Sequence, residues 1–251
     1  MSKFLSNFRA LSSLIFPIIC PACHLKVTTE LLDIGICRKC RDLIPIEVFQ
    51  VKRGEVKVFA GSRYSPAMAN LILLAKESNQ LQARKYLVDC LVKSLSRAIA
   101  VHSNQRNCVS FEIILIPIPS RNAANRTRGF EHVELLLKLL REKRNSSNLK
   151  TLNCLQHRKK VLDQSTLNFK ERELNMLGAF KINARFSGLV DEIGENQIKA
   201  GESSIGETLV FLVDDLVTTG ATVQAATLAL NRRGVRVDGT LASCATDGFT
   251  H

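Results

Sequence analysis

The sequence lacks the features of a membrane-spanning or exported protein. No segment approaches the run of roughly 18 apolar residues that a helix needs to cross a bilayer. The amino-terminal stretch 1–17 has no small-residue cleavage site after its apolar part, and Arg9 interrupts that part. Its apolar residues recur at helical spacing, which predicts a short amphipathic helix. We therefore expect a cytoplasmic protein that does not insert into membranes.

Acidic residues are also few. The 251 residues include 23 acidic and 35 basic side chains, so the formal net charge is +12. This balance favours polyanionic partners, such as nucleic acids or phosphorylated metabolites. The excess is concentrated between Arg121 and Arg172, where we count thirteen basic and five acidic residues. A solvated surface is the usual explanation of a basic stretch. The position of this one, between the segments 116–121 and 210–222, favours a functional role.

Disulfide bonds are not expected, because the eight cysteines occur in a chain without an export signal. Four of them form two C-x-x-C pairs separated by thirteen residues: Cys20, Cys23, Cys37 and Cys40. Each pair places two thiolates on one tight turn, and two such turns complete the tetrahedral sulfur shell that suits zinc. A redox pair normally occurs singly, and chance rarely produces two pairs in so short a segment. The spacing predicts one structural Zn²⁺ site with no position open for catalysis.

Strand and helix patterns alternate along the rest of the chain. Nearly continuous apolar runs over 111–118 and 208–213 predict strands that are buried on both faces. The other predicted elements are strands over 56–61 and 235–245, helices over 66–76, 80–101 and 222–233, and a surface loop over the acidic, glycine- and serine-rich interval 187–207. This alternation predicts an α/β fold with a mostly parallel sheet and helices on both faces. We expect residues 1–50 to form an amino-terminal helix and zinc ribbon, and residues 51–251 to form the larger domain.

The strongest functional signal is the segment 210–222, in which an apolar strand leads through two aspartates into a loop and a helix. In open α/β sheets, ligands bind where loops leave the carboxyl ends of strands. The loop's N–H groups can converge on a phosphate at the positive end of the helix, and a glycine lets the backbone approach the anion closely. The residues expected at the phosphate are Thr218, Thr219, Gly220, Ala221 and Thr222. Asp214 and Asp215 are then expected to bind ribose hydroxyls or to associate with Mg²⁺.

Two alternatives explain this segment less well. An N-capped helix after an acidic turn would account for one aspartate and one threonine, but not for the whole D-D-x-x-T-T-G-x-T pattern. A nucleotide-binding loop of the G-x-x-x-x-G-K-[ST] type would need a lysine that is absent here.

The segment 210–222 resembles the ribose-phosphate motif of type I phosphoribosyltransferases. Residues 116–121, Ile-Pro-Ile-Pro-Ser-Arg, end the other buried strand and resemble the pyrophosphate loop of the amidotransferase-type members. Together with the arginine-rich segment 126–130, the pair Tyr64 and Lys76, and the cysteine pairs, this order resembles the ComF family of late competence proteins over about 16–245. The chain departs from the family's common pattern at Glu131-His132, where Asn-Gln is usual.

The resemblance implies a type I phosphoribosyltransferase-like sheet behind a small zinc ribbon, with a basic, flexible hood over about 121–175. It implies binding of 5-phosphoribosyl-1-pyrophosphate with Mg²⁺. The residues that it assigns to the pyrophosphate or the hood are Ser120, Arg121, Lys76, Arg126 and Arg128. His132 and His157 lie in the same region, but the sequence pairs neither with a partner, so we leave both out of the expected site.

Two classes of function remain open. The first is an enzyme that transfers or hydrolyses phosphoribosyl pyrophosphate, with an unknown acceptor. The second is a protein of DNA uptake, which binds the sugar phosphate and handles single-stranded DNA, with a competence helicase as a further partner. A salvage transferase for nucleobases is a weaker alternative, because such enzymes do not need a zinc ribbon. The oligomeric state is left open.

Overall fold

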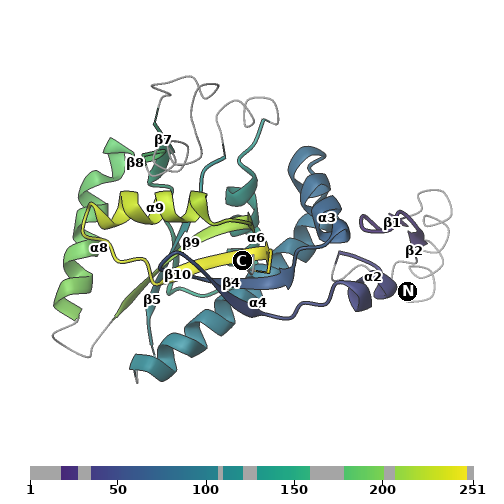
Figure 1. Cartoon of the computed structure of the whole chain (residues 1–251), viewed down its shortest axis with the longest axis horizontal. Coiled ribbons are helices and arrows are strands. Elements are labelled where there is room, and N and C mark those ends of the chain that lie inside the picture. The colour runs from purple at the N-terminus through teal and green to yellow at the C-terminus, as the bar shows by residue number, and fades with distance from the viewer. Residues whose placement is uncertain are drawn as a thin grey trace, which may run out of the picture.

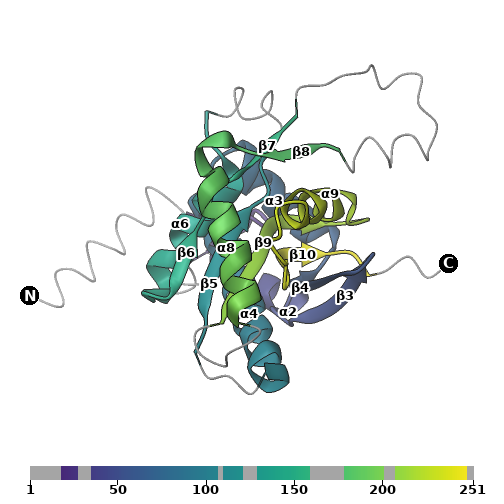
Figure 2. The same ribbon diagram turned by 90° about the vertical axis from the view of Figure 1, so that its left-hand side faces the viewer.

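A six-stranded sheet forms the centre of the computed structural model, and all of its neighbouring strands are parallel except the first pair. In spatial order the strands are β3 (Phe49–Arg53), β4 (Val56–Arg63), β10 (Gly239–Ala245), β9 (Thr208–Val217), β5 (Glu112–Pro117) and β6 (Leu149–Thr151). Figure 2 shows this order across the molecule. The structure describes residues 18–27, 35–106, 110–120, 129–158, 178–200 and 207–247. The prediction of an α/β fold with a mostly parallel sheet is confirmed.

Helices cover both faces of the sheet (Figure 1). One face packs against α3 (Pro66–Glu77), α4 (Leu81–Arg106) and α6 (His132–Arg144), and the other against α8 (Ser187–Ala200) and α9 (Ala221–Asn231). Phe211 joins the first core and its neighbour Leu212 joins the second. Both side chains are fully buried. Burial on both faces explains why the sequences of the central strands are continuously apolar and do not alternate between apolar and polar residues.

Local sequence signals mark the start of α3 and the end of α9. Ser65 caps α3, since its hydroxyl accepts a hydrogen bond from the Met68 N–H at 3.2 Å, and Pro66 occupies the first helical position. Gly234 follows α9 with a φ of 77°, a left-handed conformation that favours glycine. The predicted start of α3 is confirmed, whereas α9 ends at Asn231, two residues before the predicted end at residue 233.

The predicted surface loop over 187–207 is wrong for most of its length, because α8 occupies residues 187–200. Val190, Ile193 and Gln197 recur at helical spacing and are buried. The Gln197 side chain accepts a hydrogen bond from the Arg236 N–H at 2.8 Å and donates to the Arg236 carbonyl at 3.1 Å. This packing outweighs the low helix propensity of two glycines and the acidic composition that suggested a loop.

Two small antiparallel pairs complete the described structure. The pair of β7 (Leu155–His157) and β8 (Phe180–Ile182) is followed by a short 3₁₀ turn, η3 (Ala184–Phe186). The pair of β1 (Ile18–Ile19) and β2 (Lys26–Val27) precedes α2 (Arg38–Leu43). No helix among the described residues is long and apolar enough to cross a membrane.

The amino-terminal module lies beside α3 and α4 at one end of the molecule (Figure 1). The buried hydroxyl of Tyr86 in α4 donates a hydrogen bond to the Ile44 carbonyl, and Asn70 in α3 donates to the Pro21 carbonyl at 3.1 Å. Cys20, Cys37 and Cys40 belong to the same apolar core as the inner faces of these helices. The cysteine module is therefore packed on the main fold rather than suspended from it.

Candidate functional site

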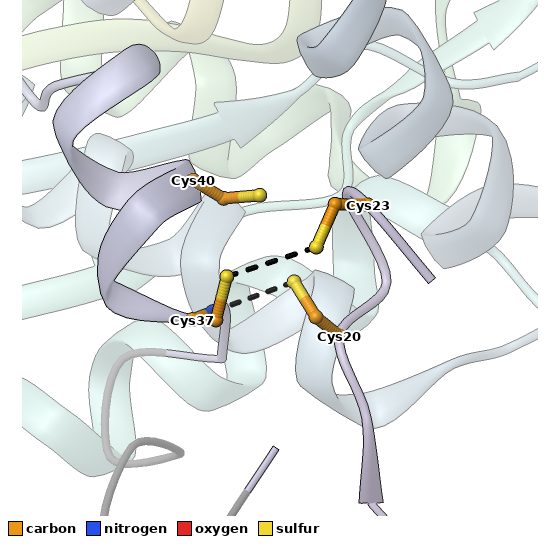
Figure 3. Close-up of side chains that lie close together, drawn as sticks. All are labelled: Cys20, Cys23, Cys37 and Cys40. Atoms are coloured by element: carbon orange, nitrogen blue, oxygen red, sulfur yellow. Dashed lines mark hydrogen bonds between the residues drawn. The ribbon is translucent and has the colours of Figure 1, made fainter. Parts of the chain in front are cut away.

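The four cysteines of the two C-x-x-C pairs converge on one point (Figure 3). Cys20 and Cys23 follow β1, Cys37 precedes α2, and Cys40 lies within α2. Their sulfur atoms all lie within 4.8 Å of one another, and the Cys23 and Cys37 sulfurs are 3.7 Å apart. Zinc–sulfur bonds of about 2.3 Å in a tetrahedron would separate neighbouring sulfurs by about 3.8 Å, whereas a disulfide needs about 2.05 Å. The four thiols could bind one metal ion, in a geometry consistent with structural zinc.

Backbone N–H groups favour the thiolate form of one cysteine in this cluster, Cys20. The Cys37 N–H donates a hydrogen bond to the Cys20 sulfur at 3.4 Å (Figure 3). Burial alone would raise the pKa of the Cys20 thiol, but this bond and N–H groups of residues 22 and 23 lower it to about 7. Burial raises the pKa of Cys37 and Cys40. A bound cation would supply the charge that stabilises four thiolates together.

A second cluster lies at the carboxyl end of β9. The strand runs to Val217, beyond the predicted end at residue 213, so Asp214 and Asp215 belong to the strand itself. Asp214 is half-buried, whereas the Asp215 side chain is only 4% exposed. Burial and the neighbouring charge of Asp215 raise the pKa of the Asp214 carboxyl well above its ordinary value. The two adjacent carboxylates therefore have different environments.

Asp215 is held between two basic side chains from the helices on one face of the sheet. Its Oδ2 atom lies 3.2 Å from Lys76 Nζ of α3 and 3.4 Å from His132 Nε2 of α6. His132 is fully buried and Lys76 is partly exposed. Burial alone would raise the pKa of Asp215, but the charges of Lys76 and His132 hold it below its ordinary value. Lys76 thus lies beside Asp215 near the carboxyl end of β9.

The sequence offers no partner for His132, and the structure supplies one in Asp215. The position of His132 in the sequence could have indicated this contact. His132 begins the first described helix after β5, and β5 ends at the same edge of the sheet as β9. His157 also lies near this edge. Its Nε2 atom is 2.9 Å from the Pro119 carbonyl, and its ring lies 4.7 Å from the ring of Phe180. His157 therefore joins the β7–β8 pair to the loop after β5.

The loop between β9 and α9 has the shape expected of an anion site. Thr218 and Thr219 are exposed, and Ala221 and Thr222 form the first turn of α9, whose N–H groups have no partner within the helix. Gly220 has a φ of 82°. A Cβ there would overlap the Arg53 stem and come within 2.6 Å of Arg53 Cγ. Both the left-handed backbone and the close approach of Arg53 therefore require glycine at this position. The first turn of α9 carries no acidic residue that would repel an anion.

The loop after β5 lies directly beside the end of β9. Pro117 pairs with Val213 in the sheet register, and the Ile118 N–H donates a hydrogen bond to the Val213 carbonyl at 2.9 Å. Ser120 follows two residues later at the same edge. The loops that follow β5 and β9 therefore begin side by side at one edge of the sheet. Arg121, Arg126 and Arg128 lie outside the described residues.

The site thus combines an exposed helix-start loop, two carboxylates and a lysine at the carboxyl edge of a parallel sheet. Such an arrangement can hold an anionic ligand that also carries hydroxyl groups. Comparisons of the sequence with protein-family models and with curated proteins find no match.

Proposed function

We propose that this chain is a ComF-type protein with a type I phosphoribosyltransferase fold, which binds phosphoribosyl pyrophosphate with Mg²⁺. The observation that carries the proposal is the register of β5 against β9, which brings the loop 117–120 beside the loop 218–222. One loop is suited to a sugar 5-phosphate and the other to a pyrophosphate. The two carboxylates and Lys76 lie at the same edge.

The roles of the described site residues follow from their environments. Thr218 to Thr222 hold the 5-phosphate, and the half-buried Asp214 accepts hydrogen bonds from the ribose hydroxyls. Lys76 and Ser120 bind the pyrophosphate, and the family resemblance assigns Arg121, Arg126 and Arg128 to the same group. Asp215 keeps Lys76 in place, since Lys76 Nζ lies 3.2 Å from its carboxylate.

Transfer of the phosphoribosyl group depends on residues that position the ribose and neutralise the pyrophosphate more than on a protein nucleophile. As pyrophosphate departs, positive charge develops on the ribose and negative charge on the leaving group. Catalysis then depends on holding the ribose in position and on neutralising the pyrophosphate. Mg²⁺ would supply part of that neutralisation, and the basic side chains would supply the rest.

We also propose that the metal ion of the cysteine cluster is Zn²⁺ and that its role is structural. An all-thiolate tetrahedral shell favours zinc over the harder divalent cations. The four thiols fill the shell, so no position is left for a reacting water molecule. The ion would join the segment after β1 to α2 within the amino-terminal module, and that module packs against α3 and α4.

Replacing Asp214 with asparagine tests the ribose assignment. The substitution keeps the side-chain shape but replaces a carboxyl oxygen, which can accept a hydrogen bond from a ribose hydroxyl, with an NH2 group that can only donate. Leaving a buried hydroxyl without its acceptor costs about 1–3 kcal/mol, so we expect affinity for phosphoribosyl pyrophosphate to fall about 5- to 150-fold. Isothermal titration calorimetry with Mg²⁺ measures the change.

Asp42→Asn is the matched control, because Asp42 is an exposed aspartate of α2, outside the proposed site. It should bind like the unaltered protein. Unchanged affinity in Asp214→Asn would refute the ribose assignment. Absence of binding to the unaltered protein would refute the proposed function itself. Incubation with labelled phosphoribosyl pyrophosphate and pools of nucleobases, amines or single-stranded DNA would then separate transfer, hydrolysis and binding alone.

A second proposed function is the handling of single-stranded DNA during competence, with a helicase as partner. It is favoured by exposed basic residues on the neighbouring helices α4 and α6: Lys93, Arg97, Lys138, Arg141 and Arg144. The last turn of α6 carries three basic residues, Arg141, Lys143 and Arg144. Basic side chains along packed helices are suited to a phosphate backbone.

Salt dependence tests the DNA proposal. Each neutralised phosphate releases counterions, so the affinity for labelled oligo-dT should fall steeply as salt rises. Fluorescence anisotropy at several salt concentrations gives the slope. Lys138→Glu combined with Arg141→Glu should reduce that slope by about 1–1.5, because each phosphate that is no longer neutralised removes roughly 0.7. Affinity that is indifferent to salt would count against direct DNA binding, whether or not the sugar phosphate binds.

A further inference from the structure

Arg53 ends β3 and is 8% exposed. Its guanidinium joins the two loops that follow β9 and β10. Nε donates a hydrogen bond to the Thr218 carbonyl at 2.6 Å, while Nη2 donates to the Thr246 carbonyl at 2.7 Å and to the Thr246 hydroxyl at 3.2 Å. Nη1 donates to the Lys52 carbonyl at 3.0 Å. One side chain from an edge strand therefore fixes the backbone of the loop that follows β9, far away in the sequence.

The β3–β4 hairpin is itself packed against α9. A Cβ on Gly54, in the hairpin turn, would come within 3.0 Å of the Gln224 side chain. The absence of a side chain at Gly220 lets the Arg53 stem lie directly against the start of α9. These close approaches hold the guanidinium behind the loop, with little room to move.

The acceptors around Arg53 are all neutral oxygens of backbone carbonyls and a hydroxyl. Within the described part of the chain, Arg53 forms no ion pair with a carboxylate. An arginine stays charged in proteins, and burying a charge without a counter-charge is costly. An anion bound to the neighbouring loop would provide the missing counter-charge.

The contact with Thr218 also orients the loop's hydrogen-bond donors. The described peptide bonds are trans, so the C=O and N–H groups of one peptide plane point in opposite directions. The Thr218 carbonyl points at Arg53. The Thr219 N–H of the same plane therefore points away from Arg53.

We infer that Arg53 is a positioning residue for the phosphate end of the ligand. It aims the 218–219 peptide at the anion and places a positive charge behind the loop. This inference rests on the proposed function, because it assigns the 5-phosphate of the sugar phosphate to this loop. Arg53 acts at one end of the site only, since its hydrogen bonds do not extend to the β5 loop or to Lys76.

Two ligands allow binding at the two ends of the site to be measured separately. Ribose 5-phosphate reports on the 218–222 loop, and inorganic pyrophosphate with Mg²⁺ reports on the β5 loop. In Arg53→Met we expect the dissociation constant for ribose 5-phosphate to rise at least tenfold and that for pyrophosphate to stay within twofold. Arg53→Lys should be intermediate, because an ammonium keeps the charge but cannot span both carbonyls. Arg63→Met, at an exposed arginine of β4, is the control and should change neither constant.

Calorimetry below each variant's melting temperature gives both constants, and the melting temperature itself reports on the fold. If the unaltered protein binds neither probe, the proposed function is wrong. If it binds both probes but Arg53→Met binds ribose 5-phosphate normally, or loses both probes equally, the inference about Arg53 is wrong. If neither variant at Arg53 folds, the residue is a structural support and the inference is also wrong.

Discussion

Replacing Cys37 with serine is expected to release the metal ion and to destabilise the whole chain, not only its amino-terminal module. Apparent zinc-binding free energies of about 10–16 kcal/mol in small zinc modules are folding free energies, because the site does not exist in the unfolded chain. Cys37 also belongs to the apolar core that includes the inner faces of α3 and α4. Loss of the ion should therefore loosen the packing around Tyr86 and lower the melting temperature by more than about 10 °C.

Metal content by mass spectrometry and melting by circular dichroism measure this effect. Cys154→Ala provides the control, because Cys154 is a buried cysteine of the other core, on the opposite face of the sheet. It should lose some stability through the missing sulfur while retaining one zinc ion per chain. A Cys37→Ser protein that keeps its zinc, or a metal-free protein that melts at the normal temperature, would contradict the structural role.

Replacing Asp215 with asparagine is expected to lower the free energy of unfolding by about 3–5 kcal/mol, the usual cost of removing one partner from a buried ion pair. The substitution keeps the shape of the side chain but leaves Lys76 and the fully buried His132 without their shared carboxylate. Because Lys76 is partly exposed, water offsets part of its loss, and the lower end of this range is expected. Urea unfolding at neutral pH gives the value.

The stability that Asp215 contributes through Lys76 and His132 should depend on pH. The pKa of Asp215 is lower in the folded chain than its ordinary value of about 3.9. Its stabilising contribution is therefore fully present above about pH 4 and is lost as the pH falls through the lowered folded pKa. The stability difference between the unaltered protein and Asp215→Asn should narrow in acid.

Asp191→Asn is a matched control, since Asp191 forms a partly exposed ion pair with Arg233 and should contribute less to stability than the buried Asp215. If the two substitutions have equal effects at neutral pH, Asp215 is not the anchor of Lys76 and His132.

The residues that sequence patterns predicted best are those whose signals are local. The Ser65–Pro66 helix start, the apolar strands and the cysteine spacing each depend on neighbours within a few residues of the chain. The loops that follow β5 and β9 lie at one edge because these strands are parallel neighbours in the sheet. Acidic composition misled the prediction at α8, because tertiary packing of its buried face decided the conformation there.

The sequence by itself determined the alternation of strands and helices, the set of four cysteines that could bind a metal ion, and the loop after β9 with its two aspartates. Only the tertiary structure decided which of those aspartates is buried and which basic side chains reach it. The pairing of His132 with Asp215 and the hydrogen bond of Arg53 to Thr218 join residues far apart in the chain, and no local pattern encodes them. Such interactions depend on the order and twist of the strands and on how the helices pack on them, so they form only when the whole sheet is assembled.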